Sequence, residues 1–121
     1  MGARSRRKGH DWEREVAKRI SEALGVETVR NLGEVRGDDI GQDLVGCDPL
    51  VVQCKTGIRP NLKGAWLEAR GKALADPTAI PIAVARMERA DPDDARRSIE
   101  VVVLSLDDFL AIAKCWWEDI I

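Results

Sequence analysis

The chain has 121 residues, of which 45% are apolar and 33% are charged, with three cysteines and a net charge of −2. This length allows one domain with a genuine core and excludes two, and the absence of any eighteen-residue apolar run predicts that no segment spans a membrane. Residues 1–72 hold 14 Lys and Arg against 11 acids, whereas residues 73–121 hold 5 against 10. The first part of the chain is therefore the place to look for an anionic partner such as nucleic acid.

Residues 1–9 form a compact basic segment that contains Arg4, Arg6, Arg7 and Lys8. No apolar region follows it, so we do not expect a secretory signal. The segment is either a solvated, mobile arm or a contact for a nucleic-acid backbone.

Residues 10–24 predict an amphipathic helix, because apolar residues recur at three- and four-residue steps from Trp12 to Leu24 and Gly25 follows them. Glu13 lies on the apolar stripe, where an acid is costly unless it is paired or bound to a ligand. The alternative is a place at the edge of the stripe near the helix start, where the helix dipole favours negative charge.

Residues 26–30 predict a short strand, and a loop rich in glycine over residues 31–41 follows it. The segment from Asp43 to Lys55 then predicts a β-hairpin, because two apolar runs flank the turn residues 46–49. Strand side chains alternate between faces, so Gln53 and Lys55 point one way and Cys54 the other.

The rest of the chain predicts a helix over 61–75, strands over 80–87 and 98–104 separated by a polar loop, and a last helix over 105–119. The order α-β-β-β-α-β-β-α gives an α/β fold, a single domain over residues 1–121 with a mixed sheet flanked by helices. Because residues 99–104 are almost continuously apolar, we expect both faces of that strand to be covered.

The last helix has more apolar surface than a small domain readily buries. Core packing and a dimer interface are both open interpretations of this surface. The residues concerned are Phe109, Leu110, Ile112, Trp116 and Trp117.

The three cysteines, Cys47, Cys54 and Cys115, lie in apolar segments, and their spacing fits no zinc motif. We expect reduced, buried thiols in a cytoplasmic protein.

Phosphodiester hydrolysis requires an activated water and stabilisation of charge on the phosphate, both of which Mg²⁺ held by oxygen ligands can supply. Asp43 is the natural central ligand, with the amide oxygen of Gln53, the backbone carbonyl of Cys54 and, directly or through water, Glu13 as further ligands. Lys55 would hold the attacking water or stabilise the phosphate. Singly, Asp43 is more often a strand-capping acid and Lys55 a solubilising charge, but their joint occurrence favours a metal-dependent nuclease.

These residues resemble the archaeal-type Holliday-junction resolvases of the PD-(D/E)XK nuclease superfamily over residues 8 to about 75. The resemblance rests on Lys8-Gly9, Glu13-Arg14-Glu15, Val29-Arg30 before a loop with glycine, Asp43-Leu44-Val45 and Gln53-Cys54-Lys55. It implies a restriction-endonuclease-like fold and a homodimeric, Mg²⁺-dependent endodeoxyribonuclease, with Mn²⁺ as a possible substitute. Such an enzyme is a hydrolase of DNA recombination and repair that resolves four-way junctions by paired, symmetric nicks.

Position by position, the resemblance matches Glu13, Asp43 and Lys55 to the catalytic acid, acid and lysine of the family. It matches Arg14 and Arg30 to arginines that serve the phosphate backbone and catalysis. We expect action in the cytoplasm, including that of a host if the enzyme comes from a phage.

The chain departs from the family pattern at Gln53, where a glutamate is usual. An amide oxygen is a weaker ligand for a hard metal, so a different nuclease of the superfamily, restriction-like or repair-like, and a catalytically inactive DNA-binding module are alternatives. Asp39 also precedes an isoleucine and competes with Asp43 as central ligand, but Asp43 leaves the tighter hairpin.

Contacts with branched DNA would be made mainly to phosphates, which position a protein without reading sequence. The candidates are Arg4, Arg6, Arg7, Lys8, Arg14, Arg30, Arg36, Arg59 and Lys63.

Overall fold

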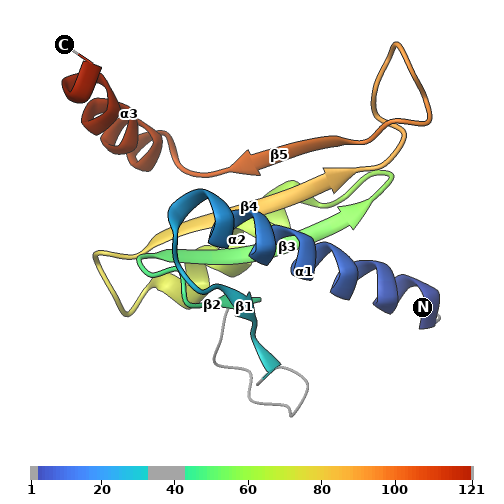
Figure 1. Cartoon of the computed structure of the whole chain (residues 1–121), viewed down its shortest axis with the longest axis horizontal. Helices are drawn as coiled ribbons and strands as arrows, with labels where there is room; N and C mark the ends of the chain where they lie inside the picture. Colours follow the sequence, from blue (N-terminus) through green and yellow to red (C-terminus); the bar gives the residue numbers. More distant parts are fainter. Residues whose placement is uncertain (1–2, 33–42, 121) are drawn as a thin grey trace.

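A computed structural model describes residues 3–32 and 43–120 (Figure 1). Along the chain it has α1 (Ala3–Leu24), β1 (Val29–Arg30), β2 (Leu44–Val45), β3 (Leu50–Gly57), α2 (Leu62–Ala73), β4 (Ile80–Met87), β5 (Ile99–Val103) and α3 (Leu106–Ile120). The predicted order of elements and the mixed α/β class are confirmed. The Asp39 alternative and Arg36 lie outside the described residues.

The main sheet has three strands in the order β3-β4-β5. β3 and β4 are parallel, with Gln53 opposite Ala83, and β4 and β5 are antiparallel, with Val84 opposite Val102. The parallel pair requires a crossover, which α2 provides. Helix α2 packs on one face of β3 and β4, and α1 packs on the other face (Figure 1).

The core lies between α1 and the sheet. Trp12, Val16 and Ala17 of α1 pack against Leu44, Val52 and Ile82. The predicted apolar stripe of α1 therefore faces the sheet. On the other face, α2 turns the buried Ala65, Ala69 and Ala73 inward, and these small side chains let the helix lie close to the strands.

β1 and β2 form a separate antiparallel pair, with Arg30 opposite Leu44. The hairpin predicted over residues 43–55 is only partly present. β2 forms its ladder with β1 instead of β3, and the Asp43 N–H, just before β2, donates to the Val52 carbonyl of β3 at 2.9 Å. The chain reverses at residues 46–49, where Gly46 has φ +92° and a Cβ would collide with the Glu27 carbonyl. A glycine is required at this close approach.

Three expectations from the sequence need correction. Helix α1 begins at Ala3 instead of residue 10, so most of the expected basic arm forms the first turns of the helix. β5 is not covered on both faces, because Val102 is 53% exposed. Cys47 is buried as expected, but Cys115 is exposed on α3.

Candidate nuclease site

Asp43 lies at the free edge of β3, immediately before β2. Its side chain is only 8% exposed, and Oδ2 accepts a hydrogen bond from the backbone N–H of Cys54 at 2.7 Å. Its backbone is held by two hydrogen bonds: its N–H donates to the Val52 carbonyl (2.9 Å), and its carbonyl accepts from the Asn31 N–H (2.8 Å). A carboxylate has about four lone-pair sites and the Cys54 amide occupies one, so Asp43 can accept further partners. Asp43 is therefore a fixed carboxylate at a strand edge.

The backbone of Cys54 points to the same edge. In a strand, the N–H and C=O of one residue point in the same direction. Because the Cys54 N–H is bonded to Asp43, the Cys54 carbonyl faces that edge as well. The sequence prediction of a carboxylate and a backbone carbonyl beside each other is thus compatible with the structure.

Glu13 is held in an almost buried ion pair with Arg30. The Arg30 Nε donates to Glu13 Oε2 at 2.8 Å, and the two side chains are 12% and 14% exposed. Arg30 stands opposite Leu44, the residue after Asp43. The pair therefore explains how an acid is accommodated on the apolar stripe of α1, and it places Glu13 next to the β1–β2 pair that ends at Asp43.

Gln53 is buried, and both ends of its amide contact α2. Its Nε2 donates to Glu68 Oε2 at 3.0 Å, and its Oε1 accepts from Lys72 Nζ at 3.2 Å. The amide therefore joins a carboxylate and an ammonium group that lie four residues apart on one helix face.

Glu68 was not predicted from the sequence as a site residue. The structure places its carboxylate beside Gln53. A signal for this was available, because Glu68 lies three residues after the buried Ala65 and one before the buried Ala69, at the border of the buried face of α2. Lys72 lies on the same border and was also missed.

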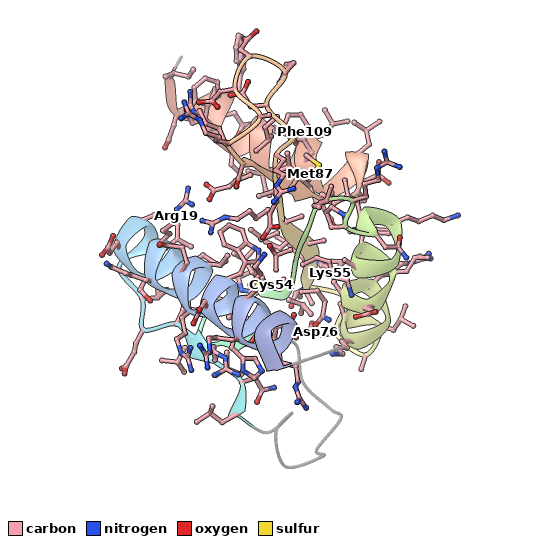
Figure 2. All side chains as sticks on the ribbon, turned by 90° about the vertical axis from the view of Figure 1, so that its right-hand side faces the viewer. Arg19, Cys54, Lys55, Asp76, Met87 and Phe109 are labelled. Atoms are coloured by element: carbon pink, nitrogen blue, oxygen red, sulfur yellow. The ribbon has the colours of Figure 1, made fainter. Side chains whose placement is uncertain are left out.

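Lys55 is exposed and lies on the α2 side of β3, two residues after Gln53 (Figure 2). Cys54 points to the α1 side, as predicted from strand alternation. Among residues 3–32 and 43–120, no ion pair or hydrogen bond of the Lys55 ammonium is found. Glu13, on α1, and Lys55, on the α2 side of β3, thus lie on opposite faces of the sheet, and the structure does not bring them together as the sequence predicted.

The predicted DNA-contacting residues differ in accessibility. Arg6, Arg7, Arg59 and Lys63 are exposed, and the side chain of Arg4 lies outside the described residues. The others are already paired: Lys8 with Glu88 (3.3 Å), Arg14 with Asp11 (3.0 Å) and Arg30 with Glu13. The ion pairs of Lys8 and Arg14 are exposed and contribute little free energy, so either cation can leave its acid for a phosphate at small cost.

A hollow of about 550 Å³ adjoins the Glu13–Arg30 pair. Three cations from two elements line it, Arg14 and Lys18 of α1 and Arg30 of β1, together with apolar side chains that include Leu32. Lys18 was not among the predicted contacts. A concave surface lined by three cations suits an anion such as a backbone phosphate.

The residues at the edge of β3 fit a magnesium ion. Within the described ranges, no three His, Cys, Asp or Glu side chains are grouped closely enough to enclose a metal by themselves. Mg²⁺ usually keeps several waters and takes only one or two carboxylates from the protein. A fixed carboxylate at Asp43 and the adjacent backbone carbonyl of Cys54 are oxygen donors of the kind that this ion prefers.

Several groups outside this site have shifted pKa values. Burial raises the pKa of the Cys47 thiol. Hydrogen bonds from Arg19 (2.6 Å) and Arg86 (2.8 Å) lower the pKa of the Glu100 carboxyl. Glu100 thus links α1 to β4 and β5, and Arg86 also stacks over the ring of Trp12 at 4.3 Å.

No family model matches the chain, and no curated protein matches it. No helix in the described ranges combines the length and apolarity needed to cross a lipid bilayer.

Proposed function

We propose that the chain is a Mg²⁺-dependent DNA endonuclease of the restriction-endonuclease-like fold, and that its substrate is branched DNA such as a four-way junction. The observation that most supports this is the Asp43 carboxylate, buried and fixed by the Cys54 amide at the free edge of β3. The buried Asp43 is bonded to Cys54, and the next residue of that strand is the exposed Lys55. A buried acid this close to an exposed lysine is an unusual arrangement for a purely structural role.

Asp43 and the Cys54 carbonyl would hold the metal. Bound there, Mg²⁺ supplies a water of lowered pKa and neutralises charge on the phosphate. We assign the second carboxylate to Glu68 instead of Gln53, because the Gln53 amide is engaged by Glu68 and Lys72. Gln53 then positions Glu68 by donating to its Oε2.

Lys55 would orient the attacking water or contact the scissile phosphate. It is exposed, and no acid among the described residues neutralises it, so its full charge is available to an anion. This role fits the position of the ammonium on the same face of β3 as the Gln53–Glu68 pair.

The DNA backbone would lie across the N-terminal part of α1 and the C-terminal end of β3, which are on the same side of the molecule (Figure 1). Arg6 and Arg7 are exposed at the first location, and Arg59 and Lys63 follow the second. The hollow lined by Arg14, Lys18 and Arg30 would hold a further phosphate. These contacts read backbone layout and not base sequence, as recognition of a junction requires.

The test is cleavage of a synthetic four-way junction, a flap and a linear duplex in Mg²⁺. We expect paired nicks in the junction, with a loss of about 10²- to 10³-fold in rate for Lys55→Ala, the range for removal of one preorganised charge-stabilising group. Lys114→Ala, on the far helix α3, is the matched control and should cut as the wild type does. An intact junction across Mg²⁺ and Mn²⁺ titrations would refute the proposal, and equal cleavage of all three substrates would favour a different nuclease of the superfamily.

A second candidate is a DNA-binding module that has lost catalysis. The engagement of Gln53 with α2 favours it, since this removes the amide from the metal. Tight junction binding without cleavage, unaffected by Lys55→Ala, would establish this alternative.

A further inference from the structure

Helix α3 has a continuous apolar stripe that nothing covers within residues 3–32 and 43–120. None of its residues is buried. The stripe follows the three- and four-residue spacing of one helix face, and the charged residues lie on the opposite face. It consists of Leu106, Phe109, Leu110, Ala113, Trp116, Trp117 and Ile120.

A short connection joins α3 to the domain. Only Leu104 and Ser105 separate β5 from the helix. Leu104 packs against the core, and Ser105 caps the helix by accepting the Asp108 N–H on Oγ (3.1 Å) and the Phe109 N–H on its carbonyl (3.0 Å). With both linking residues engaged, α3 extends away from the sheet (Figure 1).

The same chain has an apolar groove between α1 and β5. Its volume is about 420 Å³, and its walls include Val16, Ile20 and Leu24 of α1 and the exposed Val102 of β5. α1 contributes to it from Trp12 to Leu24, or roughly 18 Å at 1.5 Å per residue, and the stripe of α3 runs for roughly 21 Å. The groove therefore matches most of the length of the stripe, with about one turn of α3 extending beyond it.

The charge of α3 restricts the kind of surface that can cover its stripe. The polar face of α3 has Asp107, Asp108, Glu118 and Asp119 but only Lys114 as a cation. The groove has one cation and one acid on its wall, Arg19 and Glu100, and these two are paired with each other, so the groove is close to neutral. An acidic helix is repelled by anionic lipid and by DNA, so its apolar stripe is poorly suited to either surface.

The exposed aromatic side chains of α3 supply a substantial part of the area that a dimer uses. Phe109, Trp116 and Trp117 are 51%, 61% and 58% exposed. Aromatic side chains bury about 150–250 Å² each, so the exposed parts of these three offer roughly 300 Å². A standard interface takes about 800 Å² from each partner, and the remaining four stripe residues and the groove itself contribute to the rest.

We propose that two copies of this chain exchange their C-terminal helices, so that α3 of each copy lies in the groove between α1 and β5 of the other. The exchange covers the α3 stripe and the groove of both copies. It leaves the exposed cations of the α1 N-terminus, Arg6 and Arg7, outside the interface. This inference does not depend on the proposed nuclease activity.

The test measures the oligomeric state of the full chain by sedimentation velocity over a concentration series. Phe109→Glu/Trp116→Glu places two charges on the stripe, and Ala111→Glu/Cys115→Glu places the same two charges on the opposite side of α3. We expect a wild-type dimer, a dissociation constant raised at least about 30-fold in the first variant, as for hot-spot residues, and no change in the second. Because α3 has no buried residue, neither variant should unfold the domain, which circular dichroism checks.

A groove variant distinguishes helix exchange from direct pairing of two α3 helices. Val102→Glu should also dissociate the dimer, and a mixture of Val102→Glu with Phe109→Glu/Trp116→Glu should recover a heterodimer, because one intact helix then meets one intact groove. A monomeric wild type, or a Val102→Glu chain that dimerises normally, would overturn the proposal.

Discussion

Trp12 in α1 and Trp117 in α3 occupy equivalent places on the apolar stripes of two amphipathic helices, yet the first is 3% exposed and the second 58%. α1 turns its stripe onto the sheet, and its Trp12 also donates from Nε1 to the Val84 carbonyl at 3.1 Å. α3 turns the same kind of stripe to the surroundings. Amphipathic periodicity therefore predicts that a surface will be covered, but not whether the cover comes from the same molecule.

The largest expected difference between these two regions is in stability. Trp12→Ala should lower the free energy of unfolding by about 3–5 kcal/mol, because it leaves a cavity in the core. Trp117→Ala should change it by less than about 0.5 kcal/mol when introduced into the Phe109→Glu/Trp116→Glu background, where no dimer forms. Urea denaturation measures both, and a loss of several kcal/mol at Trp117 would show that α3 packs within its own chain.

A second prediction places the chemistry in the packed region. Glu68→Gln keeps the size of the side chain but removes the charge beside Gln53, and we expect kcat/KM on junction DNA to fall about 10- to 100-fold, the range for groups that support a metal site. Glu118→Gln makes the same chemical change on α3 and should have no effect on the rate. If Glu68→Gln cleaves as the wild type does, the assignment of the second carboxylate to Glu68 is wrong.

The smallest predicted effect concerns the ion pairs that join α1 to the edge of the sheet. The pKa of Glu100 is lower in the folded protein than its ordinary value, so its contribution to stability is present above pH about 4.5 and is lost as the pH falls through the folded pKa. Because the group is partly exposed, Glu100→Gln should cost no more than about 1 kcal/mol at pH 7. The difference from the wild type should shrink below pH 4, and a difference that stays constant from pH 7 to pH 3 would contradict the assignment.

The order of the elements could be predicted because it depends on local patterns. The alternation and turn residues that identify β3 and β4 are contained in short segments, and the start of α2 is fixed by Asn61, whose side chain accepts the Gly64 N–H. The start of α1 was missed because Arg4 to Lys8 have no apolar spacing, although charged residues of this kind are good helix formers.

The arrangement of the site depended on contacts between distant segments, which sequence spacing does not report. Asp43 and Lys55 could be predicted as a pair because they lie close in the chain. The bond between Gln53 and Glu68 joins residues 15 apart, and that between Glu13 and Arg30 joins residues 17 apart. The uncovered face of β5 was missed for a similar reason, and for α3 the sequence left core packing and a dimer interface open, since an apolar run does not say which molecule will cover it.

The central claim is that the edge of β3 binds a divalent metal through Asp43, and calorimetric titration of the full chain with Mg²⁺ tests it most directly. Asp43→Asn preserves the shape of the side chain and an oxygen for the Cys54 amide, while Asp48→Asn makes the same change at an exposed turn position. We predict binding to the wild type and to Asp48→Asn, and at least about tenfold weaker binding to Asp43→Asn. Equal binding to all three proteins, or none to the wild type, would contradict the account.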